Sequence, residues 1–570
     1  MRNKDVAAAL SEIGILLEVE GKDKFKPKSY ERAARSVENL GEDIEAIAAR
    51  GELTSVPGIG EAIAKKIESF LSTGHIEALD SLRERIPVKV AELDAIPGMG
   101  PKTIKLLYDE LGVTDIESLE TALKEGRLKG LKGIGPKTET EIANGIGLAR
   151  SGIGRSFLPD ALATAEQVMA HMHTVGHVRR IEVAGSVRRR KETVGDLDFL
   201  VETDDEGAAV NAFVGLEGVA DVLAKGATKT SVRLRSGLQM DMRVIPAESF
   251  GAGLQYFTGS IDHNVHLRTI ALKKGLELNE YGLFKGKKQV EGDSEEGIYR
   301  ALGLDYIPPE LREDSGEIDA ALTHTLPKLI SLSDIRGDLH GHTNESDGTN
   351  TTEEMVEAAA VKKYDYYCIS DHTKSLKIAH GLDEKRLLNR IQEIDELNSS
   401  GRWRMRILKG VEVDILSNGE LDMSDNVLAQ LDVVTASVHS RMKDSKDAIT
   451  ERVCTALSNR NVHIFGHPTG RLILERPEYE IDLDRVFEAA KSSRVAMELN
   501  SHPHRLDLNP GNLRRAVKAG LKIAINTDAH SVLELENMKF GIFQACRGWI
   551  EPRNVLNTLP LKDLLAAIRK

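Results

Sequence analysis

Three aspartates and a Gly-Ser pair have the residue types and spacing that phosphoryl transfer requires. Gly185-Ser186 precedes Asp196-Leu197-Asp198, and a third carboxylate, Asp241, follows in a later apolar segment. Residues two apart in an extended segment face the same side, so Asp196 and Asp198 can offer both carboxylates to one cluster of hard cations. Asp241 from a neighbouring strand would complete a site for paired Mg²⁺ or Mn²⁺ ions. Asp-x-Asp by itself is more often a surface turn, so the wider context has to decide.

The wider context of these aspartates resembles the palm of family X DNA polymerases, the polymerase-beta-like repair enzymes, which have the same motifs in the same order. The resemblance implies that Asp196, Asp198 and Asp241 are catalytic. It implies dNTPs as substrates and gapped or primer-template DNA as partner. Its implied nucleotide-binding residues are Gly185, Ser186, Arg189, Arg155, Tyr256, Phe257, Gly259, Asn264 and Arg268. Val194 departs from the beta-type pattern, which has a phosphate-binding serine there, so triphosphate contacts are fewer or differently supplied.

Composition limits the alternatives. The chain has 570 residues and 41% hydrophobic content, which predicts several domains with large cores, and no segment approaches a membrane span. The N-terminus runs into an amphipathic helical pattern instead of an apolar signal region. Three cysteines, Cys368, Cys454 and Cys546, are far apart and form no disulfide framework. We therefore expect a cytoplasmic monomer with no membrane partner.

A net charge of −13 argues against a basic coat, so DNA contacts must be local. Three segments near the front each contain a Gly-hydrophobic-Gly turn between helical patterns. Such a turn exposes N–H groups at the start of the next helix, where a DNA phosphate can bind without base contacts. One copy would be a simple helix connection, but three resemble the helix-hairpin-helix motif. The expected DNA-binding glycines are Gly58, Gly60, Gly98, Gly100, Gly133 and Gly135.

The first hairpin carries a further candidate. The segment from Pro57 to Ile67 resembles the polymerase-beta lyase domain, and Lys66 matches its Schiff-base lysine. A lysine amine can attack the aldehyde of an abasic site if neighbouring cations or burial lower its pKa. Ala62 stands where that domain has another phosphate-binding lysine, so the alternative is a solvated lysine on a helix face.

The last third of the chain has a different pattern. After an acidic, proline-containing stretch that we interpret as a linker, seven apolar strand-like segments alternate with helical patterns at intervals of about 25–40 residues, which predicts a parallel barrel. Polar residues lie at the predicted carboxyl ends of these strands, where barrel enzymes build their sites. A single buried histidine is usually a core residue, but this many together are hard to explain by packing.

The motifs at these strand ends, such as Asp338-Leu339-His340-Gly341-His342 and Thr527-Asp528-Ala529-His530, resemble the PHP (polymerase and histidinol phosphatase) domain. The resemblance implies a phosphoesterase with about three ions, of Mn²⁺, Zn²⁺ or Fe²⁺. Its metal ligands carry over to His340, His342, Asp347, His372, Glu412, His439, His467, Asp528 and His530. No ligand is substituted, which favours hydrolysis over a structural role.

Together these patterns predict a multidomain α+β and α/β protein with an all-α helix-hairpin-helix region, a mixed-sheet nucleotidyltransferase palm and a distorted (β/α)7 barrel. The expected domains are two helical ones (1–90 and 91–150), the palm (151–250), a nascent-base-pair and nucleotide-binding domain (251–318), a linker (319–334) and the PHP domain (335–570). The expected function is a DNA polymerase that fills short gaps in DNA repair, with 3′→5′ exonuclease action, 3′-end processing and cleavage at abasic sites. The alternatives are a PHP phosphatase acting on a small phosphomonoester and a non-catalytic DNA-end-binding scaffold.

Overall fold

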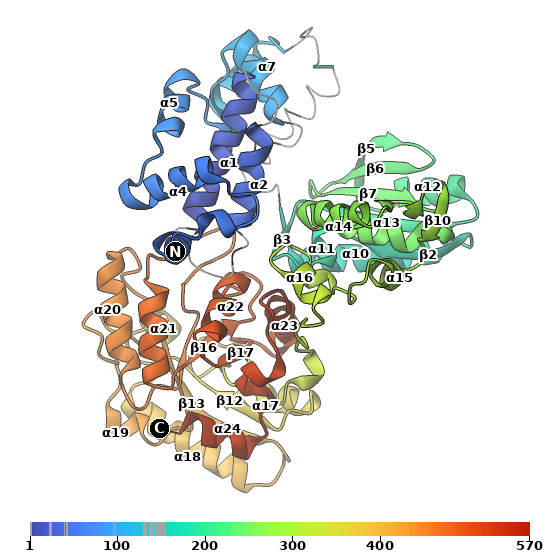
Figure 1. The fold of residues 1–570 in the computed structure, drawn as a ribbon. Coiled ribbons are helices and arrows are strands. Elements are labelled where there is room, and N and C mark those ends of the chain that lie inside the picture. Colours follow the sequence, from blue (N-terminus) through green and yellow to red (C-terminus); the bar gives the residue numbers. More distant parts are fainter. Residues whose placement is uncertain are drawn as a thin grey trace. The chain divides into compact units, whose positions relative to one another are not determined.

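The computed structural model describes residues 3–21, 26–38, 40, 44–94, 96, 99–128, 131, 134–135, 142 and 155–569. The chain divides into two compact units, Met1–Leu326 and Pro327–Lys570 (Figure 1). Gly98 and Gly133, two of the expected DNA-binding glycines, lie outside the described residues.

The front of the first unit is helical. A single apolar cluster runs from Val6 to Ile142 through both of the expected helical domains, because each helix turns its buried face toward a shared core. Gly74 and Gly112 end α4 and α7 in the left-handed conformation that glycine adopts without strain. The helices are α1 (Asn3–Glu20), α2 (Lys26–Glu38), α3 (Ile44–Ala49), η1 (Leu53–Ser55), α4 (Glu61–Thr73), α5 (Glu77–Arg85), α6 (Val90–Asp94), α7 (Pro101–Leu111) and α8 (Ile116–Lys124).

A mixed five-stranded sheet follows, in the order β2-β4-β7-β6-β5. Only β4 and β7 run parallel, and these two central strands carry the predicted catalytic aspartates. The elements are β1 (Ser156–Phe157), α10 (Leu158–His173), β2 (Val178–Val183), α11 (Gly185–Arg188), β3 (Thr193–Val194), β4 (Asp196–Thr203), α12 (Glu206–Val214), β5 (Val219–Lys225), β6 (Lys229–Leu234) and β7 (Gln239–Val244).

The unit ends with helices and a small antiparallel sheet of order β10-β9-β8. The elements are η2 (Ala247–Ser249), α13 (Phe250–Thr258), α14 (Ile261–Lys273), β8 (Glu277–Asn279), β9 (Gly282–Lys285), β10 (Lys288–Glu291), α15 (Glu295–Ala301), η3 (Pro309–Leu311) and α16 (Glu317–Leu322).

The interpretation of the acidic stretch, residues 310–319, as a linker is wrong, because several of its charged side chains are buried. Arg312 is fully buried, and its guanidinium lies 2.6 Å from Glu295, which also pairs with Arg188 at 2.6 Å. Glu317, at the start of α16, is buried as well and lies 2.7 Å from His263. Glu295 on α15 thus pairs with two arginines from different segments, and Glu317 contacts a buried histidine whose pKa is lowered by burial. Composition alone does not detect such pairs.

The second unit contains a sheet of seven parallel strands in sequence order, β11 to β17, wrapped by helices (Figure 1). The ring closes at its carboxyl end, where Gly341 bridges Ala529 and the backbone N–H of His342 donates to Ala529 O at 2.8 Å. The strands are β11 (Gly337–Asp338), β12 (Tyr366–Ile369), β13 (Arg406–Asp414), β14 (Val433–Ser437), β15 (Ile464–Phe465), β16 (Ala496–Asn500) and β17 (Ile523–Asn526). The predicted fold class is therefore confirmed.

Helices connect these strands and plug the barrel. Inward-facing residues such as Cys368 and Leu408 pack with Leu564 and Ile568 of the last helix, α24. The inner apolar cluster therefore fills the barrel at the amino-terminal end of its strands. The polar residues lie at the opposite, carboxyl-terminal end. The helices are η4 (Leu332–Asp334), α17 (Thr352–Val361), η5 (Lys377–Ala379), α18 (Glu384–Ser399), α19 (Asp425–Leu428), α20 (Lys446–Leu457), α21 (Leu483–Ser492), α22 (Pro510–Lys518), η6 (Val532–Asn537), α23 (Met538–Arg547), η7 (Pro552–Asn554), η8 (Leu556–Thr558) and α24 (Leu561–Ile568).

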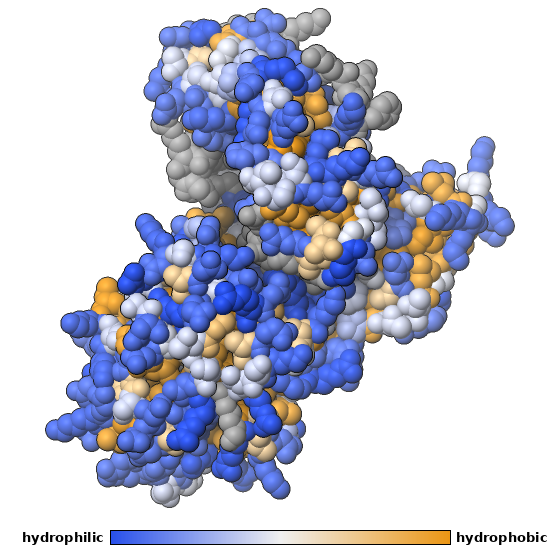
Figure 2. Space-filling view, turned by 60° about the vertical axis from the view of Figure 1, so that its left-hand side comes forward, coloured by the Kyte–Doolittle hydropathy of each residue, from blue (hydrophilic) through white to orange (hydrophobic). Residues whose placement is uncertain are grey.

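Hydrophilic residues cover most of the face drawn in Figure 2. Within the described residues, no helix combines the length and apolar character that crossing a membrane requires.

Candidate active sites

The three predicted catalytic aspartates lie together on β4 and β7. Because the strands are parallel and in register, Asp198 stands directly beside Asp241, and Asp196 lies two residues earlier on β4. Asp241 is 8% exposed and Asp196 is exposed, so the carboxylates occupy the boundary between sheet and solvent. Lys229 Nζ lies 3.0 Å from Asp241 Oδ2.

The electrostatics of this group favour bound cations. Burial, followed by repulsion from Asp196 and Asp241, raises the pKa of Asp198 to about 7. Partial desolvation and then Asp241 raise the pKa of Asp196, although Arg155 and Arg189 oppose this shift. Asp196 and Asp198 resist ionisation beside one another and beside Asp241, so the group fits divalent ions such as Mg²⁺, whose charge would offset the repulsion.

Gly185 makes the close approach of Asp198 possible. It begins the short helix α11 with a φ of 63°, and a Cβ at this position would lie 2.4 Å from Asp198 Oδ2. The backbone N–H of Ala184 also donates to Asp198 O at 2.8 Å. The Gly185-Ser186 turn is thus fixed against the aspartate strand.

The two predicted triphosphate arginines border the aspartates but have protein partners. Arg155 donates to Thr193 Oγ1 and to Thr193 O, both at 2.8 Å. Arg189 Nε lies 3.1 Å from Glu313, and its Nη1 donates to the carbonyl oxygen of Thr258. Val194 is buried in β3, so its side chain offers nothing to a phosphate.

The predicted nascent-base-pair segment spans the end of α13 and the start of α14. Tyr256 and Phe257 make an edge-to-face pair with centroids 5.1 Å apart, and Gly259 follows at the helix end. Asn264 donates to Tyr256 O and accepts from Gln255, both at 2.7 Å, so its amide faces the protein interior in this structure. Arg268 Nε contacts only the backbone oxygen of Asn264 among its hydrogen bonds to described residues, at 3.3 Å.

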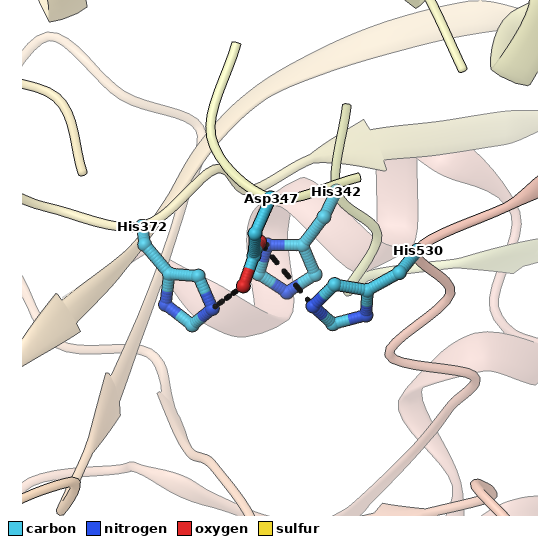
Figure 3. A group of neighbouring side chains, drawn as sticks. All are labelled: His342, Asp347, His372 and His530. Atoms are coloured by element: carbon cyan, nitrogen blue, oxygen red, sulfur yellow. Dashed lines mark ion pairs between the residues drawn. The ribbon is translucent and has the colours of Figure 1, made fainter. Parts of the chain in front are cut away.

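The nine predicted metal ligands of the barrel converge at the carboxyl end of its strands. Three groups have all their ligand atoms within 4.8 Å of one another, and Figure 3 shows one of them, with Asp347 between His372 and His530. The groups are His342, Asp347, His372 and His530; His340, His342, Glu412 and Asp528; and His372, Glu412 and His439. Among the described residues, every group that meets this distance lies in the barrel, so the palm carboxylates are more widely spaced.

Glu412 is the centre of the cluster. Its Oε2 lies 2.8 Å from His372 Nδ1, and its Oε1 lies 2.9 Å from His467 Nε2 and 3.3 Å from His439 Nε2. His467 therefore joins the cluster through Glu412, which can bridge ions bound on either side.

The charges in this cluster fit metal ions. Burial would raise the pKa of Glu412, but His372, His439 and His340 hold it well below its ordinary value. Burial and the neighbouring histidines lower the pKa of His342 to about 4, so it is neutral. The buried atoms His340 Nε2 and His342 Nδ1 make no hydrogen bond with any described residue. Despite its burial, Glu498, Asp528 and Glu412 raise the pKa of His340 well above its ordinary value, so an ion bound there would displace a proton. Imidazole nitrogens beside ionised carboxylates are the donors that Zn²⁺, Mn²⁺ and Fe²⁺ take.

Two carboxylates outside the predicted ligand set orient the rings of two ligand histidines. His340 Nδ1 lies 2.8 Å from Glu498, and His439 Nδ1 lies 2.8 Å from Asp414. Such contacts fix which ring nitrogen is free to bind an ion. Asn500 adds a 2.9 Å hydrogen bond to Asp528 Oδ2.

Sequence reasoning missed Arg505, which has no motif around it. Its Nε lies 3.9 Å from Asp528 Oδ2, and its charge is the second cause, after burial, of the lowered pKa of His467. Three other basic residues near the ligands have partners within the protein. Lys374 pairs with Glu384, Arg441 with Asp444, and Arg471 donates to two backbone carbonyls.

The hairpin turns share one local structure. In each copy the apolar residue between the glycines is buried and donates its N–H to the carbonyl three residues earlier: Ile59 to Val56, Met99 to Ile96 and Ile134 to Leu131. A Cβ at Gly60, Gly100 or Gly135 would meet nothing within 4 Å. The backbone at these described glycines is therefore open to approach.

Lys66 lies on α4 beside a cavity of about 750 Å³ in the front helical region. Its Nζ donates to Ala62 O at 3.1 Å and lies 6.0 Å from the centre of the Tyr30 ring. Lys26, Arg85 and Glu77 line the same cavity, so one acidic residue faces three basic ones and the wall is basic on balance.

Comparisons with known proteins agree with this architecture. Family models match residues 1–76 (helix-hairpin-helix domain), 90–147 (SAM-like helix-hairpin-helix tandem), 253–313 (DNA polymerase beta thumb) and 338–502 (PHP domain). These matches and the fold define a polymerase-beta-like chain joined to a PHP barrel.

Individual relatives narrow this class. The chain is 39% identical to the DNA polymerase/3′-5′ exonuclease PolX of Bacillus subtilis, over 100% of both chains. It therefore belongs to the PolX family, the family X DNA polymerases with a PHP domain. It is also 25% identical to DNA polymerase lambda of Rattus norvegicus over 51% of this chain and 53% of that protein. A probable phosphatase of Acetivibrio thermocellus is 30% identical over 35% of this chain and 80% of the phosphatase.

Proposed function

We propose that this chain is a DNA-directed DNA polymerase that fills short gaps during DNA repair, and that its barrel removes nucleotides or blocking groups from 3′ ends in the 3′→5′ direction. The observation that carries the proposal is the pairing of Asp198 with Asp241 on adjacent parallel strands, in a chain similar over its whole length to a polymerase/exonuclease.

In the palm, Asp196, Asp198 and Asp241 would hold Mg²⁺ or Mn²⁺. When bound, such ions lower the pKa of the primer 3′-hydroxyl and neutralise the leaving pyrophosphate. Gly185 keeps the turn close to Asp198, and Ser186 would offer its hydroxyl to the dNTP phosphates. Arg155 and Arg189 bring positive charge to the same edge, and both exchange a protein partner for phosphate in this proposal.

The segment from Tyr256 to Arg268 would contact the sugar and the nascent base pair. Tyr256 and Phe257 form an aromatic surface at the end of α13 that fits a deoxyribose, with Gly259 leaving room beside it. Asn264 and Arg268 would check the minor groove, where acceptor atoms look alike for every correct pair. For Asn264 this requires release of its amide from Tyr256 and Gln255.

In the barrel, the nine ligands would hold about three ions of Mn²⁺, Zn²⁺ or Fe²⁺, which supply Lewis acidity for phosphodiester hydrolysis. Glu412 fixes the shared position between the ligand groups, and Glu498 and Asp414 hold His340 and His439 in orientation. The same site would process blocked 3′ ends and cleave at abasic sites.

The front helices would hold DNA by its backbone. The open glycines Gly60 and Gly100 directly precede α4 and α7, whose first N–H groups fit phosphates, and we extend this role to Gly58, Gly98, Gly133 and Gly135. Lys66, on the basic wall of its cavity, is a proposed lyase nucleophile for abasic sugars. The domain limits given above, a cytoplasmic location and a monomeric state complete the proposal.

A second candidate function, hydrolysis of a small phosphomonoester, is favoured by the similarity of the barrel to a probable phosphatase. It would leave Asp196, Asp198 and Asp241 without a role.

The test uses a labelled primer on a one-nucleotide gap with a 5′-phosphate, in Mg²⁺ or Mn²⁺, with and without dNTPs. Wild type, Asp198→Ala and His342→Ala are compared. We expect Asp198→Ala to abolish extension alone and His342→Ala to abolish shortening alone. Absence of extension by the wild type with either metal would refute the polymerase proposal, and turnover of phosphomonoesters without DNA shortening would favour the phosphatase.

A further inference from the structure

One sector of the barrel mouth carries none of the nine ligands. Each of the other six strands is followed by, or ends in, a metal-ligand residue, but the segment after β16, residues 501–509, has none. This segment lies between the loops that bear His467 and Asp528, and it contains Arg505.

The loop that carries Arg505 is held rigidly by its neighbour. Arg471 Nε donates to Arg505 O at 2.8 Å, and the N–H of Ile473 donates to His504 O at 2.7 Å. Asp507 accepts from the N–H of Thr469 at 2.9 Å. These bonds fix the backbone of the loop and leave the Arg505 side chain directed toward the ligand cluster.

The guanidinium of Arg505 is partly enclosed, but its donors have no acceptor among the described residues. Its side chain is 22% exposed, and Nε lies 3.9 Å from Asp528 Oδ2, which is too long for a hydrogen bond. Within the described residues it forms no hydrogen bond through any guanidinium nitrogen. Asp528 is already oriented by Asn500 at 2.9 Å and His342 at 2.9 Å, so Arg505 is not needed to position it.

A partly buried guanidinium beside the ligand cluster is stabilised by an anionic partner. When Asp528 binds an ion, its charge no longer compensates the guanidinium, and the two positive charges repel each other in an enclosed site. A phosphate group between them satisfies both, because the planar guanidinium donates in parallel to two phosphate oxygens. A carboxylate partner from the protein would fill the same role, but none is within hydrogen-bond distance among the described residues.

We propose that Arg505 binds the non-bridging oxygens of the phosphodiester that is cleaved in the barrel. This inference rests on the proposed nuclease function of the barrel and adds the residue that holds the phosphate from the ligand-free sector. Arg505 is a substrate-binding residue in this view, and the metal ligands keep their ions without it.

The test compares full-length wild type with Arg505→Ala and Arg505→Lys, all loaded with Mn²⁺. Arg402→Ala is the matched control, because Arg402 lies before β13 at the opposite end of the barrel and is paired with Glu353. Shortening of a labelled single-stranded oligonucleotide gives KM and kcat. Calorimetric titration with inorganic phosphate measures anion binding directly, and elemental analysis measures bound manganese.

We expect Arg505→Ala to lower kcat/KM for shortening about ten- to hundredfold and to weaken phosphate binding about tenfold, because a charge-assisted bidentate contact is lost. Arg505→Lys should retain part of the kcat/KM and part of the phosphate affinity, because lysine keeps the positive charge but cannot donate in parallel to two phosphate oxygens. Bound manganese, primer extension and the Arg402→Ala protein should match the wild type.

Two results would overturn the inference. Unchanged phosphate binding in Arg505→Ala would exclude the phosphate contact, and a parallel loss of manganese would assign Arg505 to support of the metal ligands. Neither result depends on the polymerase, and failure of the wild type itself to shorten DNA would instead refute the proposed nuclease function.

Discussion

The two candidate metal sites of this chain are built in opposite ways. In the palm, three carboxylates project from two neighbouring strands of an open sheet, and one of them is exposed. In the barrel, nine ligands come from the ends of strands around a closed ring, and six of them are buried. Both sites concentrate charge, but only the barrel balances carboxylates with imidazoles.

This difference indicates how each site acquires its ions. Three mutually repelling carboxylates offer too few donors to fill the coordination of two ions, so we expect the palm to bind them together with the dNTP phosphates. The barrel provides many donors fixed by outer partners, so we expect it to keep its ions without substrate.

The largest effect is expected from Glu412→Gln. Removing the central carboxylate leaves His372, His439 and His467 without their shared anionic partner, so shortening of 3′ ends should fall on the order of 10³-fold and bound metal should drop. Exonuclease assays and elemental analysis measure this. Glu488→Gln, at an exposed residue of α21, should change neither. Retention of metal and activity in Glu412→Gln would contradict a bridging role.

Gly185→Ala tests the palm alone. The new Cβ would lie 2.4 Å from Asp198 Oδ2, at a φ of 63° that alanine adopts only with strain, so Asp198 must shift. Primer extension should fall about hundredfold because small misplacements of reacting groups are costly. Gly176→Ala, where a Cβ meets nothing within 4 Å, is the control. Loss of extension in both variants would point to general instability instead.

Asp198→Asn should stabilise the metal-free protein. The folded-state pKa of Asp198, about 7, exceeds the ordinary value of 3.8. Ionisation therefore destabilises the folded state progressively as pH rises from about 4 to about 7, and the cost is fully present above pH 7. In chelator, the variant should gain about 2 kcal/mol near pH 8 and little near pH 4.

Thermal unfolding at both pH values measures this gain. Asp221→Asn, at an exposed residue of β5, should show no comparable pH-dependent gain. An Asp198→Asn gain of equal size at pH 4 and pH 8 would mean that charge repulsion is not its cause.

The smallest effect is expected from Glu498→Gln, which tests how firmly the barrel holds its ions. Glu498 accepts from the N–H of His467 at 2.6 Å and contacts His340 at 2.8 Å, and an amide would place a donor against one of these donors. Metal affinity should fall about tenfold, as for other outer partners of metal ligands. Titration with a chelator measures it, and primer extension should be unaffected. If Glu498→Gln released more metal from the palm than from the barrel, Glu498 would not be a support of the barrel ligands.

Much of this organisation could be predicted from the sequence. Asp-x-Asp in an apolar segment and His-x-His at a strand end are local patterns, because residues two apart in a strand share a face whatever the rest of the chain does. The repeated Gly-hydrophobic-Gly turns are equally local, and each copy that the structure describes buries its apolar residue. Seven regularly spaced strand patterns were sufficient to predict the parallel barrel, because each βα unit has a characteristic length.

Other features depend on pairing between distant segments. Residues 310–319 have the composition of a linker, yet Arg312 pairs with Glu295 and Glu313 pairs with Arg189, and composition cannot match such distant partners. The family resemblance implies that Asn264 contacts the nucleotide, but the sequence does not show that Gln255 and Tyr256 on the preceding helix hold its amide. Arg505 carries no motif, and its importance appears only when the barrel places it beside Asp528.

The sequence by itself therefore determined which residues can bind metal and phosphate, since donor chemistry belongs to residue types and short spacings. Only the tertiary structure decided how those donors are balanced. It set the pKa of Asp198 through burial and two neighbouring carboxylates. It placed Glu412 among five histidines and left the guanidinium of Arg505 without a hydrogen-bond partner among the described residues. Electrostatic energy depends on distance and burial, and both are fixed by segments far apart in the chain.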